Sequence, residues 1–173
     1  MSKNNTTAQK LEKDKQDKEL DSLSQRADKL INKYAFHSGV AGFIPVPILD
    51  TLALLSIQRT MLYRLCKLYG VPFSLKLAKT LLKTMMGLVA WNVAGPMVTS
   101  AIKIIPGIGL LAGGTGMAAL GSASTYATGK VFQKHFERGG TLEDFDLEKA
   151  RETFAAELEK GKELSSKKDK KQA

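Results

Sequence analysis

Two glycine-bearing segments have residue types that could hold a phosphate or a dinucleotide. Gly129 and Lys130 are adjacent, as in a phosphate loop, but Val131 follows in place of Ser or Thr, and Ser124 stands where the loop needs its first glycine. Residues 107–112 match G-x-G-x-x-A, yet no predicted strand precedes them and no acid follows about 20 residues later to bind a ribose. Both segments are therefore predicted to be turns and helix-packing sites, and no cofactor is expected.

The other groups that could do chemistry are isolated in the sequence. His37 and His135 are far apart and belong to no zinc-binding motif, so no metal is expected. Cys66 is the only cysteine and has leucines close by, which is typical of a small apolar core residue rather than of a nucleophile. We therefore expect that the protein is not an enzyme.

Asp50 is the only acidic residue between Asp28 and Glu137. One interpretation is that it complements the positive end of the helix in which it lies. The other is that it pairs with a cation in the core, because an unpaired carboxylate in apolar surroundings is costly. Gln58 and Arg59 share its surroundings only if the helix folds back, so both interpretations stay open.

Charge is distributed unevenly along the 173 residues. Residues 1–33 and 130–173 are rich in Lys, Glu, Asp and Gln, whereas the middle carries most of the apolar residues. The net charge of +9, from 26 Lys and Arg against 17 Asp and Glu, favours an anionic partner. The inner leaflet of a membrane fits better than nucleic acid, because the lysines of both ends alternate with acids and no aromatic–basic stripe is present. No apolar signal segment opens the chain, so we expect a cytoplasmic-membrane protein with both termini in the cytoplasm.

The spacing of apolar residues predicts an all-α protein with about five helices, since no segment alternates as a strand does. Residues 1–19 are predicted to be a polar disordered tail, residues 20–138 a helical membrane-associated core, and residues 139–173 an amphipathic helix with a disordered Lys-rich tail from residue 167. A stripe from Leu20 to Tyr34 marks the first helix. Gly70 and Gly139 are predicted to end helices, and the last helix is expected to be capped by Thr141.

The segments 84–102 and 108–129 are uncharged and long enough to cross a bilayer as helices, with a turn at Pro106 and Gly107 between them. Small residues spaced by four, such as Gly109 and Gly113, would let two helices approach closely. Lysines flank the outer ends and only Lys103 lies near the turn, so the outer ends should face the cytoplasm. A soluble bundle could bury the same residues, so spanning, shallow insertion and a soluble bundle remain alternatives.

Several motifs follow one another in an ordered combination: FIPVPILD at 43–50, Gln58, YGV at 69–71, IIPGIG at 104–109 and ASTYATG at 123–129. In this combination the chain resembles the bacterial YcjF-like family, also called domain of unknown function 697, over about residues 35–138. The resemblance implies a helical, membrane-associated protein whose relatives are often fused to, or encoded beside, GTPase domains. This sequence has no phosphate loop of its own.

The sequence therefore predicts a non-catalytic, membrane-associated helical protein that is an accessory or recruitment partner of a GTPase and could form homo-oligomers. The alternatives are a soluble helical adaptor that buries the same hairpin, and a membrane-remodelling or pore-forming element. The structural or functional candidates are Pro45, Pro47, Asp50, Gln58, Lys103, Pro106, Gly107, Gly109, Gly113, Gly116, Tyr126 and Gly129.

Overall fold

The computed structural model describes residues 3–41, 47–99 and 115–172, and helix is the only regular secondary structure in these ranges. The helices are α1 (Lys3–Ala41), α2 (Pro47–Tyr69), α3 (Leu75–Thr99), α5 (Thr115–Glu137) and α6 (Leu147–Gln172). The predicted all-α fold with about five helices is confirmed. None of the described helices is both long enough and apolar enough to cross a membrane.

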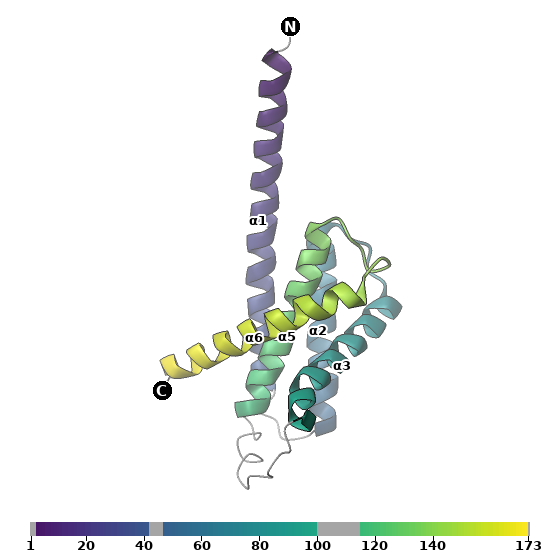
Figure 1. Cartoon of the computed structure of the whole chain (residues 1–173), viewed down its shortest axis with the longest axis vertical. Helices are drawn as coiled ribbons and strands as arrows, with labels where there is room; N and C mark the ends of the chain where they lie inside the picture. The colour runs from purple at the N-terminus through teal and green to yellow at the C-terminus, as the bar shows by residue number, and fades with distance from the viewer. Residues whose placement is uncertain (1–2, 42–46, 100–114, 173) are drawn as a thin grey trace.

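Helix α1 starts much earlier than the sequence analysis predicted. It begins at Lys3, so residues 3–19 are helical and the predicted disordered tail is wrong. The reason is intrinsic propensity, since Lys, Glu and Gln make up nine of these 17 residues and the segment contains neither Gly nor Pro. The N-terminal half of α1 extends past the other helices (Figure 1), and residues 12–22 are exposed.

The buried face of α1 is also rotated relative to the predicted stripe. Ala27, Ile31 and Ala35 are the buried positions, whereas Leu20 is 43% exposed and Tyr34 only partly buried. Residues spaced by four lie above one another on a helix, so these three form one continuous contact row.

Helix α2 ends at Gly70, whose φ of 69° suits the left-handed turn that the sequence predicts there. After a short link, the Ser74 hydroxyl accepts a hydrogen bond from the Leu77 amide at 3.4 Å, which caps the start of α3.

Helix α5 ends before Gly139, whose φ is 82°, as the sequence predicts. The predicted cap of the last helix is wrong, because α6 begins at Leu147 and the Asp146 carboxylate accepts hydrogen bonds from the next amides, Glu148 and Lys149. Thr141 instead bonds to Asp144 within the preceding loop. Helix α6 continues to Gln172, so the Lys-rich end is helical rather than disordered.

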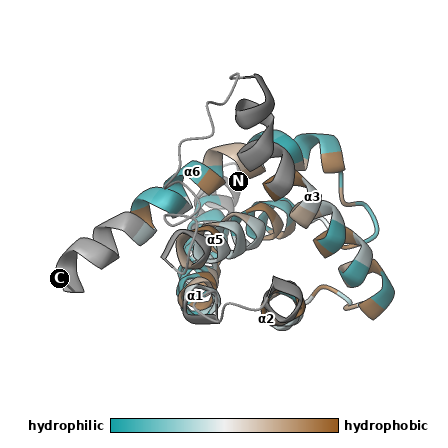
Figure 2. Cartoon of the chain, turned by 90° about the horizontal axis from the view of Figure 1, so that it is seen from below, coloured by the Kyte–Doolittle hydropathy of each residue, from teal (hydrophilic) through white to brown (hydrophobic). Residues whose placement is uncertain are grey.

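The helices share one core in which α5 is central. Figure 2 shows α5 between α1 and α6, with α2 beside α1 and α3 on the outer side, and α5 packs chiefly against α1 and α6. Each helix supplies a buried side chain to the same apolar cluster, namely Ile31, Leu62, Leu82, Phe132 and Phe154. Within the described residues, the main partners of the Gly-rich helix are thus α1 and α6, and not α3 as the predicted hairpin requires.

Candidate functional site

Four helix ends with almost no charge gather at one end of the molecule. The last residue of α1, the first of α2, the last of α3 and the first of α5 all lie there (Figure 1). We name the residues 34–41, 47–58, 84–99 and 115–129 of these helices the low-charge pole. Asp50 is the only Asp, Glu, Lys or Arg among them.

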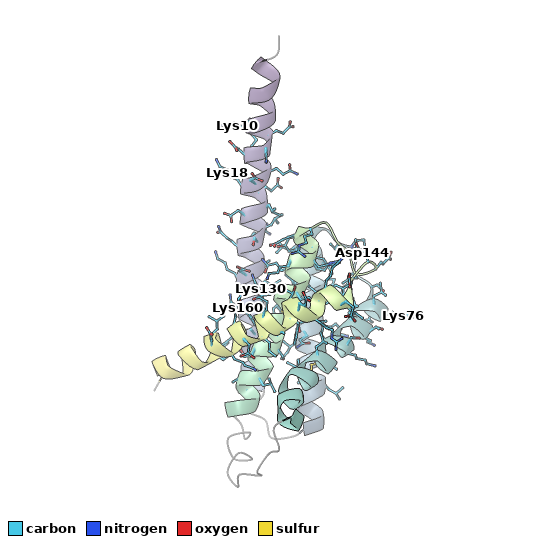
Figure 3. The ribbon with its side chains drawn as sticks, viewed as in Figure 1. Lys10, Lys18, Lys76, Lys130, Asp144 and Lys160 are labelled. Carbon is cyan, nitrogen blue, oxygen red and sulfur yellow. The ribbon has the colours of Figure 1, made fainter. Side chains whose placement is uncertain are left out.

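The cations of these four helices lie well away from the helix ends at the pole. At a rise of about 1.5 Å per residue, the nearest cations of α1, α2, α3 and α5 are about 12, 18, 24 and 22 Å along each helix from its end at the pole. These cations are Lys33, Arg59, Lys83 and Lys130. Figure 3 labels six charged residues on four helices and a loop, all of them away from the pole. Within the described residues, the pole could therefore enter an apolar medium to about 10 Å with Asp50 as the one Asp, Glu, Lys or Arg.

The pole also exposes large apolar side chains. Leu52 is 58% exposed and Phe36 is 52% exposed, and these are the two most exposed large apolar side chains among the described residues. Phe36 lies five residues before the end of α1 and Leu52 five residues after the start of α2. In water these two side chains leave apolar surface unburied, which is a common mark of an interaction site when it lies beside other uncharged surface.

A buried polar contact joins three helices within the pole. Gln58 of α2 is fully buried and donates from Nε2 to Thr125 Oγ1 of α5 at 3.3 Å. Thr125 donates in turn to Ser38 Oγ of α1 at 2.8 Å, and Ser38 donates to the carbonyl of Tyr34 at 3.0 Å. Gln58 is a sequence-predicted candidate, but its partner Thr125 and the contact of Thr125 with Ser38 were not predicted, because they depend on the relative rotation of three helices.

Two buried oxygens near this contact have no hydrogen-bond partner in the part of the chain that the structure describes. They are Oε1 of Gln58 and Oγ1 of Thr128. An unsatisfied buried polar group costs about 1–3 kcal/mol, so the interface between α2 and α5 is less stable than an apolar one of the same size.

Glycines let α5 approach its neighbours closely. A Cβ on Gly129 would lie 2.8 Å from Ile31 Cγ1 of α1, and one on Gly121 would lie 3.1 Å from the Ser38 carbonyl oxygen. On the other side, a Cβ on Gly161 of α6 would lie 2.9 Å from the Cα of Ala123. Small residues thus set the helix spacing, as the sequence analysis expected of this segment, but the partners are α1 and α6.

The remaining candidates are distributed over several regions. Pro47 opens α2, Asp50 lies in its first turn and Gly116 lies in the first turn of α5, but their side chains are not described, so the pairing of Asp50 stays a prediction. Tyr126 lines a small cavity between α1, α5 and α6, and burial raises the pKa of its hydroxyl. The candidates outside the described residues are Pro45, Lys103, Pro106, Gly107, Gly109 and Gly113.

A buried carboxylate that sequence reasoning missed joins α5 to α6. The Glu157 side chain is only 2% exposed, and its Oε1 accepts from Lys134 at 2.7 Å and from Lys160 at 2.9 Å. Burial by itself raises the pKa of Glu157, but the hydrogen bonds and charges of the two lysines together outweigh it and hold the pKa below its ordinary value. Glu157 is therefore ionised at neutral pH and fixes the position of α6.

A polar network joins α1, α2 and α5 at the end opposite the pole. Lys130 Nζ donates to Asp28 at 2.6 Å and to Gln133 at 2.9 Å, and Gln133 donates to Glu137 at 2.9 Å. The Tyr69 hydroxyl also donates to Glu137, at 3.0 Å. Burial, followed by the charge of Glu137, raises the pKa of Tyr69, so its hydroxyl stays protonated.

The described residues contain no group of three or more His, Cys, Asp or Glu side chains placed to hold a metal ion. Cys66 is fully buried, and burial raises the pKa of its thiol to about 11. The thiol is therefore protonated at neutral pH, which fits its predicted role as an apolar core residue.

The described helices thus form an all-α bundle with one low-charge end. The chain matches the family described as "Domain of unknown function (DUF697)" over residues 6–163, and it belongs to that family. The predicted resemblance is thus confirmed, and it extends beyond residues 35–138 into α1 and α6.

One curated relative is Magnetosome membrane protein 22 of Magnetospirillum gryphiswaldense. The two chains are 36% identical over 142 residues, which cover 82% of this chain and 73% of the relative. No solved structure matches the chain. Neither the family description nor the relative's name states a catalytic activity.

Proposed function

We propose that this protein is a non-catalytic, membrane-associated helical protein that attaches to a lipid surface through its low-charge pole. The observation that carries the proposal is the position of Phe36 and Leu52. Both are about half exposed, and they lie at the end of the molecule where four helix ends contain almost no charged residues. The name of the relative, a membrane protein, supports the same assignment.

The pole offers enough apolar surface for reversible attachment. Full burial of a Leu or Phe side chain is worth about 1.5–3 kcal/mol, and about half of each side chain is still exposed. Phe36 and Leu52 together would therefore contribute about 2–3 kcal/mol, to which other pole residues add. Anionic headgroups contribute up to about 1 kcal/mol for each nearby cation, and among the described residues Lys33 is the cation closest along its helix to the pole.

Vesicle flotation with two matched leucine variants tests the proposal. Leu52 and Leu75 are both exposed and both lie near the start of a helix, but Leu52 lies at the pole and Leu75, 46% exposed, at the opposite end. Leu52→Glu should lower binding to anionic vesicles about tenfold or more, because a carboxylate would replace a lipid-facing side chain. Leu75→Glu carries the same charge change and should lower it only slightly.

Equal losses in the two variants would mean that charge alone sets the affinity and that the pole does not enter the lipid. A wild-type protein that never floats would instead favour the alternative of a soluble helical adaptor. Dye release from the same vesicles would favour the pore-forming alternative.

An accessory role beside a GTPase rests on the resemblance to the YcjF-like family. In this proposal the pole anchors the protein and its charged end faces the cytoplasm, where it recruits the GTPase. Extraction of the protein from its native membrane in mild detergent, followed by identification of co-purifying chains, would test this role. A complex without any GTP-hydrolysing subunit would contradict it.

A further inference from the structure

A groove with only positive charges lies between α1 and α2. It is lined by Arg26 and Leu30 of α1 and by Arg64, Lys67 and Leu68 of α2, and its volume is about 390 Å³. We name it the cationic groove. Along the helices, Arg26 is about 22 Å from the end of α1 at the pole, and Lys67 is about 30 Å from the start of α2 there. The groove therefore belongs to the half of the molecule that the proposed attachment leaves in water.

The three cations of the groove have no ion-pair partner among the residues that the structure describes. The sequence explains this in part, because no Asp or Glu occurs between Asp50 and Glu137, so α2 beyond its first turn can add only positive charge. A second cavity, of about 400 Å³ beside the start of α6, is different, since Asp144 and Asp146 line it together with its cations. The groove is thus lined by cations alone, which favours an anionic ligand.

The two leucines of the groove favour one class of anionic ligand over the others. Leu30 and Leu68 are only partly buried and line the groove together with the three cations. A free phosphate or nucleotide would leave these leucines in water, whereas a peptide with acids on one side and an apolar residue on the other would cover them. Arg26 and Arg64 also have the planar guanidinium that binds a carboxylate through two hydrogen bonds.

We propose that the cationic groove binds an acidic amphipathic segment of a partner protein. The proposal rests on the attachment proposed above, because that orientation separates the groove from lipid. Headgroups add only about 5–8 Å to each side of the hydrocarbon core, and charges are screened beyond about 8 Å at physiological salt. With its cations about 22–30 Å from the helix ends at the pole, the groove would stand clear of the headgroups and remain open to a partner from solution.

A second copy of this chain is a poor occupant of the groove. The chain carries a net charge of +9, so two copies repel one another. Its most acidic segment, residues 142–148, already uses Asp144 to hold Thr141 and Asp146 to cap α6. A different, acidic protein fits the charge of the groove better.

Peptide binding with matched charge reversals tests the proposal. The probe is a fluorescent synthetic helical peptide with Glu on one face and Leu on the other, with a scrambled peptide of the same composition as control. Arg64→Glu combined with Lys67→Glu reverses the groove. Lys76→Glu combined with Lys79→Glu makes the same charge change on exposed, unpaired lysines of α3.

The groove reversal should weaken binding of the amphipathic probe about tenfold or more, and the α3 reversal by no more than about threefold. Far-UV circular dichroism would establish that both variants keep their helices. Equal weakening in the two variants, or a scrambled peptide that binds as well as the amphipathic one, would overturn the proposal, because either result means unspecific charge attraction.

Two further measurements with the same variants exclude the other occupants. If the groove reversal lowers vesicle flotation more than the α3 reversal does, lipid is the occupant and the proposal is wrong. If the wild type forms a dimer in sedimentation experiments that the groove reversal abolishes, the occupant is a second copy and the proposal is again wrong. Leu52→Glu separates the two proposals, since it should lose vesicle binding and still bind the probe.

Discussion

Gly129 offers a direct test of how closely α5 approaches α1. A Cβ at this position would lie 2.8 Å from Cγ1, 2.9 Å from Cγ2 and 3.2 Å from Cδ1 of Ile31, which is fully buried. Ordinary contacts between carbon atoms are about 3.5–4.0 Å, so Gly129→Ala must displace Ile31 or the helix. Overpacking of this kind lowers the free energy of unfolding by about 1–3 kcal/mol, and the better helix propensity of Ala offsets about 1 kcal/mol of this loss. We expect a net loss of stability of up to about 2 kcal/mol.

Gly87 is the matched control for this substitution. It lies within α3, is exposed, and has nothing within 4 Å of an added Cβ. Gly87→Ala should therefore stabilise the protein by up to about 1 kcal/mol through helix propensity alone. The difference between the two variants in urea denaturation, followed by far-UV circular dichroism, measures the overpacking term as about 1–3 kcal/mol.

A double-mutant cycle with Ile31→Ala completes the test. Ile31→Ala alone should cost about 2–5 kcal/mol, because it leaves a cavity in the core. It also removes all three atoms that an Ala at position 129 would meet, so Gly129→Ala should become stabilising in that background. If Gly129→Ala stabilises the wild type as much as Gly87→Ala does, or if the two effects in the cycle simply add, the close approach of α5 to α1 is refuted.

Three other experiments have defined outcomes. The two lysines hold the pKa of Glu157 below the ordinary 4.5. Ionised Glu157 therefore stabilises the fold above pH 4.5, and this stabilisation is lost as the pH falls through the lowered pKa. Wild type should thus lose more stability than Glu157→Gln between about pH 6 and pH 3 in urea titrations. Cys66 should react with a thiol reagent at pH 8 only as fast as the protein unfolds, as stopped-flow labelling would show, because burial raises its pKa to about 11. Asp50→Asn should cost about 3–5 kcal/mol by denaturation if Asp50 has a buried cationic partner, and at most about 1 kcal/mol if it only complements its helix.

The sequence was sufficient for the helical class and for several helix ends, because these depend on local residues. Gly70 and Gly139 end helices through positive φ, as predicted, and Ser74 caps the start of α3. The extent of α1 was missed because the prediction relied on an apolar stripe, whereas residues 3–19 form helix through propensity without burial.

Contacts between helices could not be predicted from local residues in the same way. Gln58 was a candidate, but its partner Thr125 is 67 residues away, and the sequence does not fix the rotation that brings them together. Gly161 was overlooked, although a glycine inside a strongly helical segment is a usable sign of close packing, here against Ala123. The burial of Glu157 could not be predicted, because in the sequence Glu157 and its two lysines resemble ordinary surface residues.

The depth of single residues in a lipid bilayer tests membrane attachment through the low-charge pole most directly. Leu52→Cys and Leu75→Cys, each in a Cys66→Ala background, would carry the same environment-sensitive fluorophore on vesicles that contain brominated lipids. The account predicts strong quenching and a blue-shifted emission for the label at position 52, and a water-like, unquenched emission at position 75. Quenching at position 75 alone, or at neither position while the protein floats with the vesicles, would contradict it.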